Sequence, residues 1–519
     1  MVVVDRASAE SDRVRGAEVV AALCLATDLG MGFPFEHGLE ATLMTMRLVD
    51  LLEVDPDTAK DTFYASLLMY VGCTTDADMS SRIFPGGLTV NMTPVEYGSS
   101  RESLAAVVRA VTPPDLSVGQ RPYERVRRLP EAARFRKPHY AALCEVAEML
   151  ATRLGLPASV SGLFSRLTER WDGNSVLGRA AGDEIPLPIR IARVARDAAY
   201  QCLLHDPVDV VGVIRARAGK AFDPAVAQAF AEASGEVLAA AEQPAWESVL
   251  AAEPKPWLEL SGEGIDRALG AMGSFSDLIS PYLSGHSAGV AGLGTRTAHV
   301  YGLSVDQIAK VRRAGLVHDL GRVAVHPAVW RKEGRLNVDD WEQVRLHSYH
   351  TERILDRSPF LADIADIASR HHERLNGSGY HRRLDGSALP PETRLVAAVD
   401  AFCAMTEPRA YRPRFGPEEA AEILTAEAGE GFHDPDVVAA ILEVVGLPSP
   451  PIRRPAGLTE REAEVLGLIA RGLQTKQVAR SLDISAKTAD HHLQSAYRKI
   501  GVSTRAAATL FAMEHGLVS

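Results

Sequence analysis

The sequence has no long hydrophobic run and few aromatic residues. Aromatic side chains make up 6% of its 519 residues, and nowhere do about 18 consecutive apolar residues occur, the length that spans a membrane. The longest apolar stretch, 19–31, is interrupted by Asp28, and the polar first residues lack the apolar core of a signal peptide. We therefore expect a cytoplasmic chain with no membrane partner.

Cysteine and positive charge are also scarce. The five cysteines are scattered and form no CxxC pair, which is typical of a reducing compartment and excludes a disulfide framework. The 56 Lys and Arg residues are outnumbered by 67 Asp and Glu residues, giving a net charge of −11. Nucleic acid cannot wrap such a surface as a whole, so any nucleic-acid contact requires a local basic module.

What the sequence does contain is an internal repeat. Residues around His37 align without gaps with residues around His286, and ERWDG at 169–173 resembles ERLNG at 373–377. Apolar residues recur at helical spacing in both copies, and alternating β-branched runs are scarce. We expect an all-α chain with a helical repeat at 1–260, a second at 261–448, a Pro-rich linker at 449–456 and a small module at 457–519.

The second repeat concentrates side chains that bind metal ions, namely His286, His318, Asp319, His347, His371, His372 and Asp400. Imidazole and carboxylate together suit divalent Fe, Mn, Co or Zn. The set exceeds the need of one tetrahedral ion and fits two octahedral ions that share a carboxylate, an arrangement that activates water for attack on phosphorus. A lone histidine is more often structural, but burying the adjacent His318 and Asp319 without a metal or another partner would be costly.

The order H…HD…H…HH…D, followed by HHERLNGSGY, resembles the HD-GYP phosphohydrolase family over about residues 280–447. The resemblance implies a helical domain that hydrolyses cyclic di-GMP with bound metal, here two divalent ions, Fe or Mn, held by the seven side chains. It implies phosphate or base recognition by Tyr380, Arg409 and Arg412. Asp319 would be catalytic as the bridging ligand, and Arg322 would be catalytic by neutralising charge on the phosphate.

Four positions depart from the family pattern. Arg322 replaces a lysine, His381 replaces the GYP proline, Cys403 replaces a second carboxylate, and Tyr282 stands where trinuclear members have glutamate. These departures favour two metal ions over three.

The first repeat is a degenerate copy. Met69 and Tyr70 replace its His-Asp pair, Arg196 replaces the last aspartate, and His37 alone is retained. This copy cannot hold the metal ions by the same chemistry, and we expect it to be a packing partner for the second repeat.

The last segment reverses the sign of the charge. Residues 453–519 contain 10 Lys and Arg against 6 Asp and Glu, a net charge of +4. Four short helical patterns follow the linker, with a capping box at Thr459 and Glu462 and a cap at Ser485 that opens the third helix. Two helices across a three-residue turn indicate a helix-turn-helix.

This segment resembles the LuxR-type DNA-binding domain, notably in TEREAEVL and ISAKTADHHL. The resemblance implies that the third helix enters the major groove and that the protein binds DNA as a homodimer, with 506–513 available for the dimer contact. The implied DNA-binding residues are Lys487, Thr488, Asp490, His491, Gln494, Arg498, Lys499 and Arg505.

Together these features predict a transcriptional regulator that combines a two-metal phosphodiesterase with a DNA-binding module. An alternative is a site of little turnover that senses a cyclic dinucleotide or another phosphate ligand and controls DNA binding. A third possibility is hydrolysis of a different phosphoester.

Overall fold

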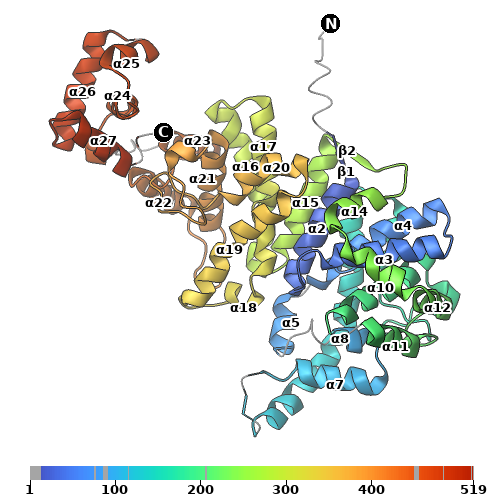
Figure 1. Cartoon of the computed structure of the whole chain (residues 1–519). Helices are drawn as coiled ribbons and strands as arrows, with labels where there is room; N and C mark the ends of the chain where they lie inside the picture. Colours follow the sequence, from blue (N-terminus) through green and yellow to red (C-terminus); the bar gives the residue numbers. More distant parts are fainter. Residues whose placement is uncertain are drawn as a thin grey trace. The chain divides into compact units, whose positions relative to one another are not determined.

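The computed structural model describes residues 13–74, 77–85, 92–114, 116–117, 119–204, 207–448, 455–482, 484–515 and 517. Within them the chain is almost entirely helical (Figure 1), which confirms the all-α expectation. Two three-residue strands, β1 (Arg13–Arg15) and β2 (Glu259–Ser261), pair antiparallel. Most of the predicted linker, 449–454, lies outside the described residues.

The chain forms two compact units, and each is assembled from separate stretches of sequence. The first comprises Met1–Ser284, Leu320–Lys332 and Arg353–Leu361. The second comprises Gly285–Asp319, Glu333–Glu352 and Ala362–Ser519. The division of the chain at residues 260 and 448 stays a prediction.

The first unit is built around a buried helix. Its α-helices are α2 (Gly16–Met31), α3 (His37–Leu51), α4 (Pro56–Leu67), α5 (Ala77–Ile83), α6 (Met92–Tyr97), α7 (Ser100–Ala110), α8 (Arg121–Arg153), α9 (Ala158–Ser161), α10 (Leu187–Cys202), α11 (Pro207–Arg217), α12 (Pro224–Glu232), α13 (Ser234–Ala239), α14 (Ala245–Ala252), α15 (Glu263–Asp277) and α18 (Pro327–Trp330). Its 3-10 turns are η1 (Val71–Thr74), η3 (Gly162–Arg166), η4 (Gly182–Glu184), η5 (Ala240–Glu242), η6 (Pro281–Leu283) and η7 (Leu320–Ala324). Residues 19–26 of α2 are at most 2% exposed, so the longest apolar stretch of the sequence is a core helix.

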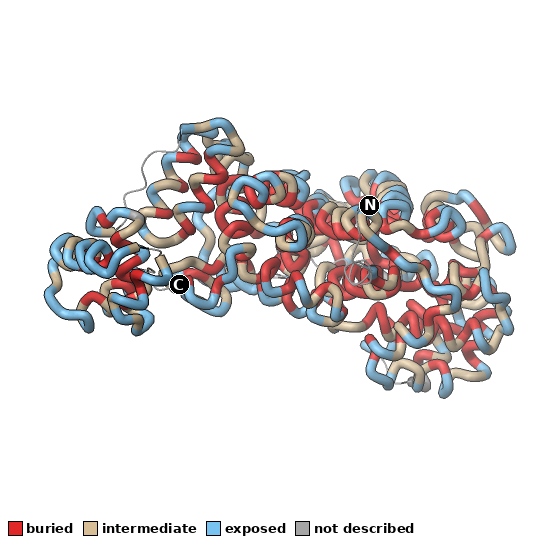
Figure 2. Tube along the Cα trace, turned by 90° about the horizontal axis from the view of Figure 1, so that it is seen from above, coloured by how far each residue is buried: buried red, intermediate tan, exposed pale blue. Residues whose placement is uncertain are grey.

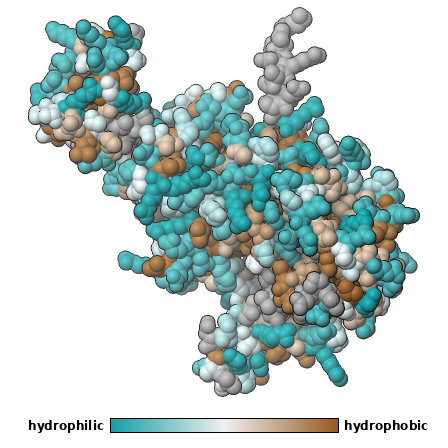
Figure 3. All heavy atoms as spheres, in the orientation of Figure 1, coloured by the Kyte–Doolittle hydropathy of each residue, from teal (hydrophilic) through white to brown (hydrophobic). Residues whose placement is uncertain are grey.

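No described helix has the length and apolar character needed to cross a bilayer. Hydrophilic residues cover much of the face drawn in Figure 3, with apolar residues scattered among them.

The second unit contains the helices that deliver the candidate metal ligands. They are α16 (His286–Tyr301), α17 (Val305–Val317), α19 (Val338–Leu355), α20 (Pro359–Ser369), α21 (Pro391–Thr406), α22 (Pro417–Gly429) and α23 (Pro435–Val445), with the 3-10 turn η8 (Gly386–Ala388). Helix α16 packs against α17, α21 and α23. Buried and exposed residues are interspersed along the chain (Figure 2), as expected for amphipathic helices around a core.

The carboxyl-terminal helices are α24 (Glu460–Ala470), α25 (Thr475–Ser481), α26 (Ala486–Ile500) and α27 (Arg505–Glu514), preceded by η9 (Pro455–Gly457). The predicted capping box of Thr459 and Glu462 is formed, and the Ser485 hydroxyl accepts the backbone N–H of Thr488 at 3.0 Å. Both predicted caps are therefore confirmed. The predicted turn residue Asp483 lies outside the described residues.

The crossing of α16 and α17 depends on Gly315. A Cβ atom at this position would lie 3.0 Å from Cα and 3.1 Å from N of Ala291, and backbone atoms cannot move aside as a flexible side chain can. Gly315 also accepts the Nδ1–H of His318 through its carbonyl oxygen, at 2.9 Å. Gly315 therefore serves both the close approach of α16 and α17 and the orientation of the His318 ring.

We expect Gly315→Ala to destabilise the protein by about 1–3 kcal/mol, because it overpacks this crossing. Thermal and denaturant unfolding of the full chain measure the effect. Gly292→Ala in α16 is the matched control, since the nearest atom to its added Cβ is the end of the Arg296 side chain at 3.9 Å. It should be neutral or stabilising, as alanine is the better helix former. Equal stability of both variants would contradict the packing argument.

Candidate metal centre

Five segments of the second unit deliver the seven side chains. His286 is the first residue of α16, His347 lies in α19 and Asp400 lies in α21. The sequence pattern predicted His318 and Asp319 within a helix, but α17 ends at Val317 and the pair follows it directly. His371 and His372 likewise follow the end of α20. The ligands thus lie largely at helix ends, where the chain can turn their side chains toward one another.

The first group of ligand atoms comes from His286, His318, Asp319 and Asp400, all buried. The Nε2 atom of His286 lies 3.0 Å from Oδ1 of Asp400, and that of His318 lies 3.0 Å from Oδ2 of Asp319. One ligand atom from each residue falls within 4.8 Å of the others. A single cation can therefore be reached by two imidazoles and two carboxylates.

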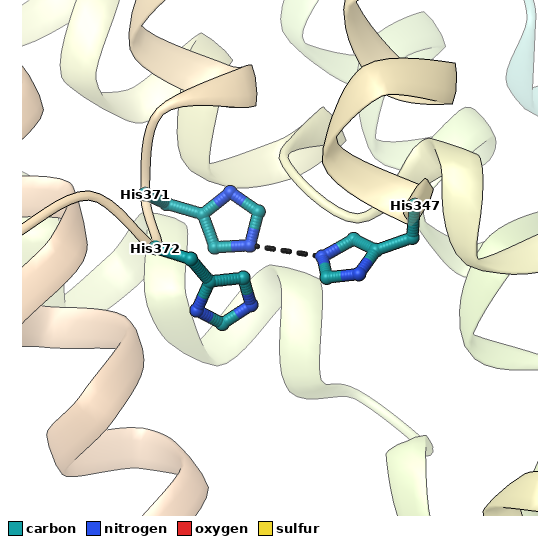
Figure 4. A group of neighbouring side chains, drawn as sticks. All are labelled: His347, His371 and His372. Atoms are coloured by element: carbon teal, nitrogen blue, oxygen red, sulfur yellow. Dashed lines mark hydrogen bonds between the residues drawn. The ribbon is translucent and has the colours of Figure 1, made fainter. Parts of the chain in front are cut away.

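The second group consists of His347, His371 and His372, drawn in Figure 4. The rings of His371 and His372 come from the segment after α20 and face His347 on α19. The Nε2 atoms of His347 and His371 are 3.3 Å apart. This group offers three nitrogen ligands and no carboxylate of its own.

Asp319 lies between the two groups. Its Oδ2 atom is 3.0 Å from Nε2 of His318 and 3.4 Å from Nε2 of His286. Its Oδ1 atom is 3.4 Å from Nε2 of His347 and 3.5 Å from Nε2 of His371. Each oxygen thus faces a different set of imidazoles, which is the geometry of a carboxylate shared by two cations.

The hydrogen bonds of the histidines fix which nitrogen faces the cluster. The Nδ1 atoms of His318, His347 and His371 each contact a backbone carbonyl three residues earlier. A carbonyl can only accept, so each Nδ1 carries a proton and each Nε2 is the nitrogen that faces the cluster. The Nε2 atoms of His347 and His371, 3.3 Å apart, need a proton or a metal ion between them. The donor set therefore fits divalent metal, as in other sites where the far nitrogen is held by a carbonyl.

The charges of the first group also indicate a site for a cation. Burial lowers the pKa of His318, but Asp319 and Asp400 outweigh it and raise that pKa to about 9. Burial also acts to raise the pKa of Asp400, yet hydrogen bonds from His286 and His318 bring it well below its usual value. Carboxylates packed this deeply need a cation, whether imidazolium or metal.

The family's second carboxylate position carries no charge in this chain. Burial, followed by the negative charges of Asp400 and Glu407, raises the pKa of the Cys403 thiol. The thiol therefore stays neutral at physiological pH. The expectation of two ions rather than three stays a prediction.

Arg322, predicted to be catalytic, lies in η7 and is 7% exposed. Its guanidinium lies 5.4 Å from the ring centroid of Trp330. Tyr380 packs against His372, with ring centroids 4.6 Å apart and the rings tilted by 31°. Tyr380 therefore contacts a candidate ligand directly.

The segment after the paired histidines is held by buried carboxylates. His381, in place of the family's proline, lies with its Nε2 3.2 Å from Glu352, which also pairs with Arg382. Glu373, 2% exposed, accepts three successive backbone N–H groups at 382–384. Ionic anchoring thus fixes the loop that carries Tyr380.

Arg409 and Arg412, predicted to anchor a phosphate, are engaged with the end of α21. Arg409 pairs with Glu407 at 3.1 Å, and the two arginines exchange backbone hydrogen bonds at 2.9 and 3.2 Å. The Arg412 guanidinium donates to several backbone carbonyls, including those of Ala404 and Met405.

Glu407 was missed by the sequence interpretation. Its Oε2 lies 2.9 Å from Nδ1 of His286. Glu407 stands seven residues after Asp400, so the two carboxylates share a helix face, a spacing that could have revealed it.

In the predicted first repeat, a buried arginine stands at the position that aligns with Asp400. Arg196 lies over the ring of Tyr70, 3.9 Å from its centroid, and 3.4 Å from Glu96. His37, the retained histidine, packs on Phe33 with ring centroids 4.6 Å apart. Burial and then the charge of Arg196 lower the pKa of His37 to about 4, so this ring is a neutral core residue.

In the carboxyl-terminal helices, five predicted DNA-contact residues share one exposed face of α26, namely Lys487, Asp490, His491, Gln494 and Arg498. The Thr488 hydroxyl is 2.7 Å from that of Ser485. Lys499 instead pairs with Glu462 at 2.6 Å, and Arg505 donates to the carbonyls of Ile469 and Leu473. The charged ends of Lys499 and Arg505 therefore form contacts within the carboxyl-terminal helices.

Two segments of the chain match known protein families. Residues 274–437 match the HD domain, and residues 456–512 match the bacterial regulatory proteins of the luxR family. This chain carries an HD domain and a luxR-family domain. Both resemblances drawn from the sequence motifs are thus confirmed.

The relatives of the HD domain are phosphodiesterases. The chain is 27% identical over 447 residues to 3'3'-cGAMP-specific phosphodiesterase 3 of Vibrio cholerae, covering 83% of this chain and 95% of that protein. It is 37% identical over 155 residues to the cyclic di-GMP phosphodiesterase response regulator RpfG of Xanthomonas campestris, covering 30% of this chain and 40% of that protein. The crystal structure of V-cGAP3, a cyclic GMP-AMP-specific phosphodiesterase of V. cholerae, shares the fold with a TM-score of 0.58 at 24% identity, over 84% of this chain and 99% of that one.

Asp319→Asn should remove both metal ions, because the amide keeps the shape but loses the charge that faces both groups. Metal analysis of protein loaded with Mn²⁺ and then dialysed measures the change. His372→Ala is the comparison, since it removes a ligand from one group only and should spare the other. Retention of two ions by Asp319→Asn would contradict a shared carboxylate.

Proposed function

We propose that this chain is a metal-dependent phosphodiesterase of cyclic dinucleotides, joined to a DNA-binding module that regulates transcription. The observation that carries this proposal is Asp319, whose two oxygens face two separate groups of imidazole nitrogens. The similarity of the HD domain to cyclic GMP-AMP and cyclic di-GMP phosphodiesterases supports the substrate class. The luxR-family domain supports DNA as the partner.

One ion would be held by His286, His318, Asp319 and Asp400. The other would be held by His347, His371 and His372, together with Asp319. Divalent Fe or Mn in such a site would supply activated water and neutralise phosphate charge. Backbone carbonyls keep the ligand imidazoles in one tautomer and one orientation. Tyr380, packed against His372, presents an aromatic ring beside the ligands, suited to a nucleobase.

A second candidate function is ligand sensing with little turnover. It is favoured by the arginines proposed to bind phosphate, because Arg412 donates to carbonyls at the end of α21 and Arg409 pairs with Glu407. Binding of a phosphate ligand would have to draw Arg409 from that carboxylate.

Full-length protein loaded with Mn²⁺ or Fe²⁺ under reducing conditions should convert 3'3'-cGAMP or cyclic di-GMP to a linear dinucleotide. Asp319→Ala should lose turnover by at least about 10²-fold, as expected when bound metal is lost. Chromatography of the products over time is the measurement. Binding of either dinucleotide without a linear product would leave the sensing function and exclude catalysis.

The luxR-family domain is proposed to bind DNA as a homodimer through α27. Leu510 and Met513 on this helix are 57% and 64% exposed, and they lie on one face with Ala506. Apolar side chains at this spacing suit a helix-to-helix contact between two copies.

Arg498→Ala should weaken DNA binding at every sequence and reduce the slope of log affinity against log salt by about 0.9, the loss of one phosphate contact. Gln494→Ala should instead relax the preference for one base pair, by about 1–3 kcal/mol. Arg461→Ala, which removes the same charge from α24, should leave the salt slope unchanged. Fluorescence anisotropy with labelled DNA at several salt concentrations separates these outcomes, and an unchanged slope for Arg498→Ala would contradict its assignment.

A further inference from the structure

His286 is oriented differently from the other ligand histidines. His318, His347 and His371 each use a backbone carbonyl three residues earlier to hold Nδ1. His286 is the first residue of α16, so no preceding turn of its own helix offers it a carbonyl. A side chain takes this role instead, since Nδ1 of His286 lies 2.9 Å from Oε2 of Glu407.

Helix α21 contacts both nitrogens of the His286 ring. Asp400 lies in this helix, and its Oδ1 is 3.0 Å from Nε2 of His286. Glu407 is the carboxyl-terminal cap of the same helix, two turns further on. With one carboxylate at each nitrogen, the plane of the ring is set by α21 and its cap.

The same oxygen of Glu407 also binds Arg409. The Nη2 atom of Arg409 lies 3.1 Å from Oε2 of Glu407. Arg409 in turn exchanges two backbone hydrogen bonds with Arg412, which is tied to the carbonyls of α21. The turn that follows α21 thereby holds the Glu407 carboxylate in place. The contact of this carboxylate with Nδ1 in turn restricts the orientation of the His286 ring.

We propose that Glu407 is a positioning residue that fixes His286 with Nε2 toward the metal site and strengthens that nitrogen as a ligand. The proposal rests on the metal site of the proposed function. A carboxylate that accepts the far N–H of a ligand imidazole raises the basicity of the ligating nitrogen. Loss of such a partner weakens metal binding by about 10–100-fold in other proteins.

The test is a Mn²⁺ titration of metal-free full-length protein, with free Mn²⁺ followed by its electron paramagnetic resonance signal. Wild type should bind two equivalents. Glu407→Leu should weaken one equivalent by about 10–100-fold and leave the other unchanged, because His286 belongs to one group only. The Mn²⁺ affinity of Glu407→Gln at the weakened site should lie between those of wild type and Glu407→Leu, since an amide oxygen accepts the Nδ1–H but carries no charge.

Glu392→Gln is the matched control. Glu392 lies in the first turn of α21 and accepts a hydrogen bond from Gln307 at 2.8 Å. Its substitution changes the same charge on the same helix and should leave both Mn²⁺ affinities at the wild-type values. Circular dichroism of each variant checks that the helices are retained.

Wild-type affinity at both sites in Glu407→Leu would overturn the proposal. Equal weakening of both sites together with loss of helical signal would also overturn it, by showing a general structural role. Failure of the proposed metal site is distinguishable, because wild type itself would then bind no Mn²⁺.

Discussion

The arrangement of the second unit depends on one buried carboxylate facing four imidazoles. Asp319 is fully buried, as are the rings of His318 and His371 on its two sides. Such a cluster is costly in a protein interior unless positive charge is placed within it. Helix ends, backbone carbonyls and the close crossing at Gly315 all hold the side chains in this costly position, which is expected where a bound cation stabilises the folded state.

The two predicted repeats differ in the charged groups that they bury at equivalent positions. In the second repeat the centre is prepared for metal. In the first, Arg196 stands at the position of the last aspartate and pairs with Glu96 over Tyr70. A guanidinium is a fixed charge, so Glu96 has a cationic partner there without a bound metal ion.

The sequence predicted the chemistry of the site better than its geometry. The seven candidate ligands were chosen by residue type and order, and the structure brings them together in two groups. The module's caps at Thr459 and Ser485 were predicted from local spacing alone. Glu407 was missed because its partner His286 is 121 residues away, and only the i+7 relation to Asp400 carries a local signal. The ion pair of Lys499 with Glu462 was missed for a similar reason, since an exposed lysine on a basic helix offers no sign of a partner 37 residues earlier. The assembly of each unit from separate stretches of sequence depends on tertiary packing, which no local pattern records.

The most direct test of the account is a crystal structure of the Mn²⁺-loaded protein with anomalous scattering recorded at the manganese edge. The account predicts two anomalous peaks, one among His286, His318 and Asp400 and the other among His347, His371 and His372, with an oxygen of Asp319 bound to each. A single peak, or two peaks that do not share Asp319, would contradict it.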